Sequence, residues 1–543
     1  MRLTRRNRLT GLVAAVAASS LVLAACSGGD DSGGGDSDSF QIAYNGDGGH
    51  DAWVDAVSNQ LRNNLDIDAS GRSYATFDEL RNDVVDRTIT TAFRTGWQPD
   101  YPSIYNYLQP LYFTGAGSND GDYSSEEFDD LMTQVSGAQE QAEAFSLQEQ
   151  AQEVLLQDLP AIPLWYSNVA AVAALDVENV SFTWQNLPDY VSISKPEGGP
   201  ITVDGSQPQN PLVPSATNET GGGNVIDNLW EGLVRYESDG TAVNAVAESI
   251  TSEDNLTWTV VIKDGQQFAD GTPVTASSFV DAWNYGAVGS NAQLNSYFYY
   301  PIAGFDEAQA DEADGLSGLT VVDDSTFTIE LNQPEASFPD RLGYSAFYPL
   351  PATAFDDLEA FGRNPIGNGV YRLAGPDAWE DDVRISLVPN ENYVGDVVPA
   401  NDGITFTFYT NLDAAYTDVQ AGNLDVLKTV PDSALTTYET DENVQSFNVP
   451  GSVFQSFTIP FSLEHFGDDE EGRLRRQAIS LAINREEITD AIFNGSRTPA
   501  RDFSSPVMPG YNDALEGSDV LEFDPERAKD LWEQANEINP WNG

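Results

Sequence analysis

Hydrophobic and polar positions repeat with two different periods early in the chain. In FQIAYNGDGG, apolar residues alternate with polar or small ones before a glycine-rich turn, which predicts a strand over residues 40–45. In the following HDAWVDAVSNQLRNNL, Trp53, Val57 and Leu61 recur at helical spacing. Strand-like and helix-like patterns continue through YATFDELRNDVVDRTITTAFRTGW. This alternation predicts an α/β fold.

The end of the sequence, DPERAKDLWEQANEINPWNG, predicts a well-specified helix that reaches Ile538. Asp524 is a favourable N-cap residue and Pro525 suits the first helical position. One face of the helix is apolar and is formed by Ala528, Leu531, Trp532 and Ala535. No strand pattern follows Pro540, so we expect the strand that pairs with this helix to lie elsewhere in the chain.

The start of the sequence has the pattern of an export signal. MRLTRRNRLTGLVAAVAASSLVLAAC carries arginines, an apolar stretch too short to cross a bilayer comfortably, and small residues before the only cysteine. Residues 1–25 are therefore the expected signal peptide. The run before Cys26 resembles a bacterial lipobox, in which Cys26 becomes the N-terminus and carries diacylglycerol; the alternative is a free thiol after an ordinary signal. Residues 26–39 are expected to form a disordered tether.

The charge balance excludes polyanionic partners. The 543 residues include 25 basic and 86 acidic ones, for a net charge of -61. Such a chain is repelled by nucleic acid and by anionic lipid surfaces. We interpret the excess of acid as a solvated surface, and expect no nucleic-acid partner.

From residue 196 onward, a series of motifs resembles the extracellular solute-binding proteins of family 5, which serve peptide and nickel ABC transporters. The motifs are NVIDNLWEGLVRYESDG, WTVVIKDGQQFADGTPVTASSFVDAW, IGNGVYRL, VPNENYVG, DVQAGNLDVL, RLRRQAISLAINREEITDAIFNG and FDPERAKDLWEQA. They occur in the family's usual order. The resemblance implies a peptide-binding lipoprotein that works with ABC permease subunits on the outer face of the cell membrane, as a monomer, without catalysis or a cofactor.

The family's closing motifs lie ahead of the others in this chain. GWQPDYPSIYNYL, YSSEEFDDLM and LPAIPLWYSNVAAV fall within residues 40–195, whereas they follow the final helix in relatives. The order implies a circular permutation, joined through the polar SISKPEGG near Lys195. Permutation is tolerated when native termini are close and the new break lies in an exposed loop.

The resemblance implies a periplasmic-binding-protein-like type II fold with two lobes and a hinge. Lobe 1 is expected to run continuously over residues 168–445, with an inserted small domain at about residues 231–345. Lobe 2 is expected to be split into residues 40–167 and 446–543. Closure of the lobes around a ligand would be a hinge motion.

The resemblance also implies a ligand site around FRTGWQPDY. Asp100 corresponds to the aspartate that receives a peptide's α-ammonium, and Arg94 to an arginine that can receive the carboxylate of a short peptide. Gly96 and Gln98 would offer main-chain groups to an extended peptide. Trp97 is equally compatible with a ligand wall and with the core.

The facing wall of that site is expected at two further residues. By alignment, Asn218 and Thr220 occupy the main-chain segment opposite Asp100, although NETGGGN is richer in glycine than its relatives. The residue pattern alone leaves other interpretations open: Asp100 as a turn residue before Pro102, and Arg94 as a structural ion pair.

Other chemistry finds little support in the residues. Only His50 and His465 are present, in neither a zinc spacing nor a nucleophile motif, and no metal site is expected. SNDGDYSSEEFD resembles a calcium loop starting at Asp120, but Leu131 stands where glutamate is needed. Two alternatives remain open: a secreted hydrolase on a peptide-binding scaffold, and a family 5 receptor for a metal chelate or a sugar.

Overall fold

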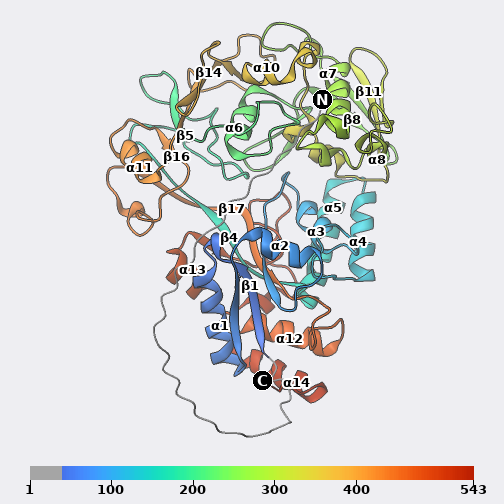
Figure 1. The fold of residues 1–543 in the computed structure, drawn as a ribbon, viewed down its shortest axis with the longest axis vertical. Coiled ribbons are helices and arrows are strands. Elements are labelled where there is room, and N and C mark those ends of the chain that lie inside the picture. The colour runs from blue at the N-terminus through green and yellow to red at the C-terminus, as the bar shows by residue number, and fades with distance from the viewer. Residues whose placement is uncertain (1–38, 543) are drawn as a thin grey trace, which may run out of the picture.

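Residues 39–542, which the computed structural model describes, form two α/β bodies, one above the other in Figure 1. The core of the upper body is built from residues between Val172 and Val444. The core of the lower body comes mainly from residues 40–166 and 454–532. The expected signal peptide, Cys26 and Gly543 lie outside the described residues.

A single twelve-stranded sheet runs through both bodies. Ten strands follow the order β12-β14-β15-β5-β16-β4-β17-β3-β1-β2, while β13 pairs with β14 and β18 with β4. The two long central strands, β4 (Ala161–Ala173) and β17 (Gln445–Thr458), are antiparallel over nearly their full length. They carry the chain between the two bodies.

The predicted strand and helix at the start of the lower body are confirmed as β1 (Phe40–Asn45) and α1 (Asp51–Leu65). β1 pairs in parallel with β2 (Ala69–Tyr74) and β3 (Ala92–Trp97). Its alternating residues are buried on both faces, because Ile42 joins the core that includes α1 while Ala43 packs with residues of α2 (Phe77–Val85). Burial on both faces is typical of parallel strands.

The predicted C-terminal helix is confirmed as α14 (Pro525–Ile538). The Asp524 side chain caps it by accepting a hydrogen bond from the Arg527 amide at 3.0 Å. Trp532 is 3% exposed and meets Trp541 edge to face, with ring centroids 5.2 Å apart. The buried Arg475 guanidinium lies 4.5 Å from the centre of the Trp532 ring. The Arg475 contact joins α14 to α12, and α14 also packs against α1.

Five further helices and one short strand complete the lower body. They are α3 (Tyr105–Tyr112), α4 (Glu126–Gly137), α5 (Gln141–Asp158), α12 (Glu470–Leu481), α13 (Arg485–Phe493) and β18 (Arg497–Pro499). No helix among residues 39–542 combines the length and apolar character needed to cross a bilayer.

The upper body combines its share of the large sheet with a separate four-stranded sheet of order β10-β11-β9-β8. Its strands are β5 (Ile201–Gly205), β6 (Val234–Tyr236), β7 (Ala242–Asn244), β8 (Ala247–Thr251), β9 (Thr257–Ile262), β10 (Leu319–Val321), β11 (Thr326–Glu330), β12 (Tyr371–Leu373), β13 (Trp379–Glu380), β14 (Arg384–Pro389), β15 (Ile404–Phe408) and β16 (Val426–Leu427). The separate sheet falls inside the range expected for a small domain, and its apolar side chains belong to the same core as the rest of the upper body.

Helices of the upper body are mostly short. They are α6 (Thr220–Leu229), α7 (Ala276–Ala287), α8 (Phe305–Gln309), α9 (Phe338–Arg341), α10 (Leu358–Arg363) and α11 (Leu412–Gln420). Across both bodies, 3-10 helices span Gly46–Gly48, Gly289–Asn291, Ser296–Tyr299, Ser345–Phe347, Ala352–Asp356, Tyr438–Thr440 and Ser518–Leu521.

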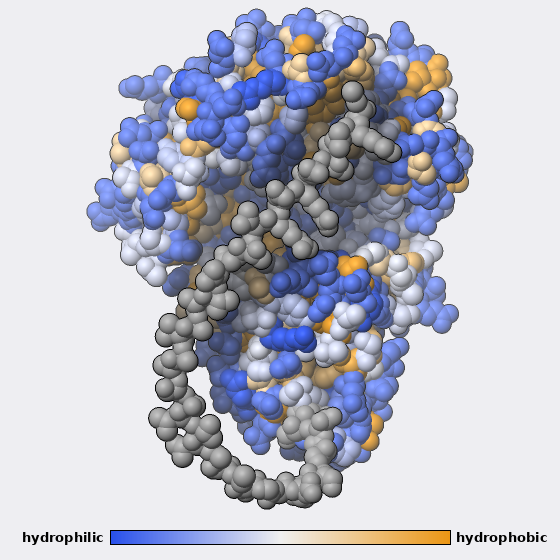
Figure 2. Space-filling model, viewed as in Figure 1, coloured by the Kyte–Doolittle hydropathy of each residue, from blue (hydrophilic) through white to orange (hydrophobic). Residues whose placement is uncertain are grey.

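The segment between β4 and β5 packs along the upper body and has no regular secondary structure. It contains two isolated bridges and the expected junction, where the Lys195 ammonium lies 2.9 Å from the Asp425 carboxylate. Pro196 and the two residues after it are exposed. The visible surface of both bodies is mainly hydrophilic, with apolar residues in scattered spots (Figure 2).

Substitution of Trp532 by alanine is expected to destabilise the lower body. The change removes a buried aromatic side chain that contacts Trp541 and Arg475, and such truncations cost about 3–5 kcal/mol. Glu533, next to it and exposed, provides the control, because Glu533→Ala should change stability by less than about 0.5 kcal/mol. Urea unfolding of both variants measures the difference. Equal stabilities would show that α14 does not depend on this contact.

Candidate functional site

A cavity of about 1200 Å³ lies between the two bodies. The lower body contributes residues 98–100, and the upper body contributes the start and inner face of α6, the strand β6 and the loop at residues 343–348. The irregular segment at residues 183–192 completes much of the wall. Most known ligand pockets have volumes of about 300–1000 Å³, so this cavity can hold a ligand of several residues.

Asp100 reaches the cavity from a loop whose geometry is set by one amide side chain. The loop follows β3, which is paired with β17 through Trp97 opposite Phe454. The side-chain oxygen of the buried Asn106 accepts hydrogen bonds from the Asp100 amide at 3.0 Å and from the Trp97 indole at 3.2 Å. Asn106 therefore fixes the backbone of the loop and directs Asp100 towards the upper body.

The Asp100 carboxyl is half-buried, and burial raises its pKa. A hydrogen bond from Asn106 and the positive charge of Arg341 oppose that rise. Arg341, in the upper body, is itself bound to Glu335, with 2.7 Å between Nε and the carboxylate oxygen. Within residues 39–542, no base lies at ion-pair distance from Asp100. Its carboxylate is therefore available to a cation that enters the cavity.

The opposite wall begins at the N-terminus of α6. Glu219 caps this helix by accepting a hydrogen bond from the Gly222 amide at 2.9 Å. Its carboxylate also accepts a hydrogen bond from the Gln209 amide at 3.2 Å. The cap keeps Asn218 and Thr220, on either side of Glu219, on the cavity wall.

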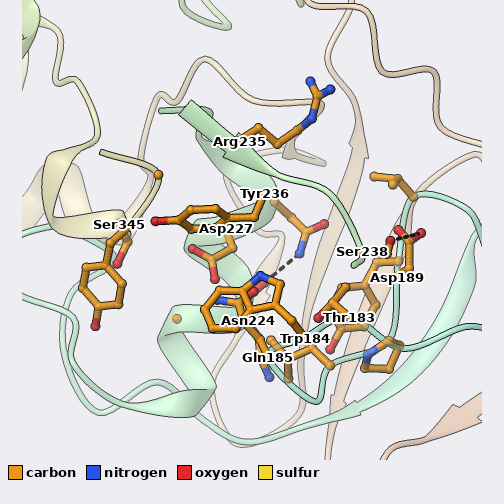
Figure 3. Close-up of a pocket in the computed structure, with 18 of the residues that line it drawn as sticks. Thr183, Trp184, Gln185, Asp189, Asn224, Asp227, Arg235, Tyr236, Ser238 and Ser345 are labelled. Carbon is orange, nitrogen blue, oxygen red and sulfur yellow. Dashed lines mark hydrogen bonds between the residues drawn. The ribbon is translucent and has the colours of Figure 1, made fainter. Parts of the chain in front are cut away.

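Asp227 lies about two turns further along α6. The Tyr348 hydroxyl donates a hydrogen bond to its carboxylate at 3.2 Å, and burial raises the pKa of Asp227 to about 6. In Figure 3 the carboxylate points between Tyr236 and Ser345, into the open part of the cavity. A deep carboxylate in this position makes the upper wall negative.

Both basic side chains on the cavity wall are already paired. The Arg235 guanidinium lies 3.2 Å from Glu231, 2.8 Å from Glu237 and 3.0 Å from Asp396. The Lys428 ammonium lies 3.3 Å from the Asp204 carboxylate. The cavity therefore offers unpaired negative charge and little free positive charge.

The structure divides the residues expected at the site between two cavities. Gln98, Asp100, Asn218 and Thr220 line the large cavity together. Arg94, Gly96 and Trp97 line a separate cavity of about 260 Å³ within the lower body.

Arg94 is held on the side of that smaller cavity. Its Nε donates a hydrogen bond to the Asn45 side chain at 3.0 Å, and its guanidinium lies 5.3 Å from the centre of the Phe77 ring. These partners come from β1 and α2. In this conformation Arg94 and Asp100 therefore do not face a common space.

Sequence reasoning missed several residues of the large cavity, above all Asp227 and Tyr190. One sequence signal for Asp227 was present: it is an acid directly after the apolar Val225 and Ile226 and close to Leu229, in a segment with the pattern of a helix. Tyr190 gave no local signal, since it comes from the irregular segment between β4 and β5.

The suspected calcium loop has a different organisation. Asp120 forms ion pairs with Arg81 and Arg87, and Ser125 caps α4 by accepting a hydrogen bond from the Phe128 amide at 3.3 Å. Among residues 39–542, no group of three histidine, cysteine, aspartate or glutamate side chains is arranged to hold a metal ion.

Comparison with known proteins relates the chain to solute-binding proteins. It is 27% identical over 318 residues to the oligopeptide-binding protein OppA of Bacillus subtilis, covering 56% of each chain. It is 29% identical over 296 residues to the periplasmic murein peptide-binding protein MppA of Escherichia coli, covering 53% of each. The chain thus spans about half the length of these curated relatives.

Among solved structures, the unliganded open form of the murein tripeptide-binding protein MppA has a similar fold, with a TM-score of 0.54. The similarity covers 63% of this chain and 65% of that one, at 24% sequence identity. The model of the bacterial extracellular solute-binding proteins, family 5, middle region, matches residues 241–543. The chain therefore belongs to family 5 of the bacterial extracellular solute-binding proteins.

Proposed function

We propose that the protein is an extracytoplasmic lipoprotein that captures peptides in the cavity between its two bodies and delivers them to an ABC importer. In this proposal the upper body is lobe 1 and the lower body is lobe 2 of a type II binding protein. The lipid anchor would be Cys26. Relatives named for binding oligopeptides and murein peptides support the class of ligand.

Asp100, on the wall of the large cavity, is the main support for a peptide ligand. A carboxylate that is partly desolvated and has no base at ion-pair distance among the described residues is poised to receive a cation. The α-ammonium of a peptide is such a cation, and it needs a charged partner because an unpaired buried charge is costly. Asn218 and Thr220 would face the bound main chain from the other side.

The β4–β17 pair is the proposed hinge. Bending these strands would bring Asp100 towards α6 and exclude water from the ligand, which is a common closure motion of two-lobed binding proteins. The register of the pair shifts between Pro450 and Phe454, close to the passage between the bodies. Such irregularities interrupt the ladder and allow a strand to bend.

The chain order fits a circular permutation of the family. The Phe466 ring contacts Phe40, with centroids 5.7 Å apart, and Trp541, with centroids 6.2 Å apart. β1 and the residues after α14 therefore contact the same aromatic ring, that of Phe466. A chain running from α14 directly into β1 would need only a short connection, as is usual in α/β folds.

Replacing Asp100 is expected to remove most peptide affinity. Asp100→Asn keeps the shape and loses the charge, and should weaken binding nearly as much as Asp100→Ala. Charged hydrogen bonds contribute about 1.5–3 kcal/mol, so the loss should be roughly tenfold to a hundredfold or more. Titration calorimetry with alanine tripeptides measures it.

The matching ligand control is the same tripeptide with an acetylated N-terminus, which should bind the unaltered protein as weakly as the free peptide binds the Asp100→Asn variant. Unchanged affinity in both variants, or equal binding of acetylated and free peptides, would remove Asp100 from the site. Cleavage of the peptide over time would instead indicate a hydrolase.

Restoring the family order is expected to preserve the fold and peptide affinity and to raise stability. The test protein joins residue 543 to residue 40 and opens the chain between Lys195 and Pro196, where the turn is exposed. Closing the break in the lower body should reduce fraying near its ends. Thermal melts and calorimetry compare it with residues 40–543 in the present order. A restored chain that fails to fold while the present one folds would contradict the permutation.

A further inference from the structure

The carboxylates on the cavity wall differ in the ion pairs and hydrogen bonds that they form. Six line it: Asp100, Asp189, Glu219, Asp227, Glu231 and Glu237. Glu231 and Glu237 pair with Arg235, while Asp189 accepts hydrogen bonds from the Ser192 and Ser238 hydroxyls at 2.7 and 3.0 Å. The Glu219 carboxylate accepts hydrogen bonds from two backbone amides.

Asp100 and Asp227 remain, each accepting one side-chain hydrogen bond and having no base at ion-pair distance among residues 39–542. Asp100 is the proposed partner of the peptide ammonium. Asp227 accepts a single hydrogen bond, from Tyr348, and no basic side chain of the described chain lies at ion-pair distance. A second cation would therefore be attracted to Asp227.

The Tyr190 hydroxyl is a second unsatisfied group on the same part of the wall. Tyr190 lines the cavity with 6% of its surface exposed, and its hydroxyl has no hydrogen-bond partner within residues 39–542. Burial and the negative charges of Asp204 and Asp227 raise its pKa. Tyr190 and Asp227 therefore line the same cavity, and each has an oxygen that can accept a further hydrogen bond from a cationic group.

Asp100 and Asp227 line the same cavity. Asp100 belongs to the lower body and Asp227 to the upper one. A peptide that holds its α-ammonium at Asp100 can therefore direct a side chain towards α6.

We propose that Asp227 and Tyr190 form a subsite that selects a lysine or arginine side chain of the bound peptide. This inference rests on the proposed function and names its substrate class. An apolar side chain would leave the carboxylate and the hydroxyl desolvated without a new partner, whereas a basic side chain supplies the missing donors. The cavity should therefore prefer basic peptides over neutral ones of equal size.

Titration calorimetry with two matched sets of peptides tests the subsite. The probes are alanine tripeptides that carry either lysine or norleucine at position one, two or three, so that the pairs differ by the ammonium group. In at least one position, lysine should bind roughly tenfold to a hundredfold more tightly than norleucine. Asp227→Asn should reduce that ratio to within about threefold while norleucine peptides keep their affinity.

Two further variants complete the test. Tyr190→Phe removes only the hydroxyl and should lower the lysine preference by about twofold to tenfold, which supplies an independent result if Asp227→Asn folds poorly. Asp306→Asn changes an exposed carboxylate on α8, outside the cavity, and should leave the preference unchanged.

The outcomes separate this inference from the proposed function. Tight binding of norleucine and lysine peptides with equal affinity at all three positions would overturn the subsite and leave the peptide receptor intact. A lysine preference that survives both Asp227→Asn and Tyr190→Phe would also overturn it. Failure of the unaltered protein to bind any of these peptides would contradict the proposed function and the subsite with it.

Discussion

The pairing of β4 with β17 is the constraint on which the site depends. The two strands are antiparallel from Ala173 opposite Gln445 to Ala161 opposite Thr458, and so they belong to both bodies at once. On the lower side β17 positions β3, and the loop after β3 carries Asp100. On the upper side β4 pairs with β16, and β16 with β5, which joins the sheet that borders α6 to the same two strands. The cavity lies where these two sets of elements face each other.

Contacts from both sides hold the irregular part of that strand pair. The Ser452 amide donates to the Asn186 side chain at 2.9 Å, and the Tyr107 hydroxyl donates to the Ser452 carbonyl at 2.5 Å. Asn186 belongs to the irregular segment that lines the cavity, whereas Tyr107 belongs to α3, next to the loop of Asp100. A bend at Ser452 would thus be linked directly to both walls. The walls carry like charges, and a ligand with two cationic groups would bring them together.

The sequence predicted the local elements better than the site. The 3.6-residue period identified α1 and α14 because each helix buries one face, and the capping chemistry of Asp524 marked the start of α14. The alternation of larger apolar residues with polar or small ones identified β1, although that strand is buried on both faces. The family resemblance predicted that Asp100, Asn218 and Thr220 belong to one site, and all three line the large cavity. The same resemblance placed Arg94 in that site. In this structure Arg94 instead contacts Asn45 and Phe77, and these contacts depend on how β1 and α2 pack, which the sequence does not show. Asp227 and Tyr190 could be recognised only from the structure, which places them on the wall of one cavity.

A crystal structure of the protein with an unmodified lysine-containing tripeptide most directly tests the role of Asp100. We expect an intact peptide between the two bodies, with its terminal nitrogen within about 2.7–3.2 Å of an Asp100 carboxylate oxygen and its main chain facing residues 218–220. A peptide bound elsewhere, or bound in this cavity with its terminal ammonium away from Asp100, would contradict that role.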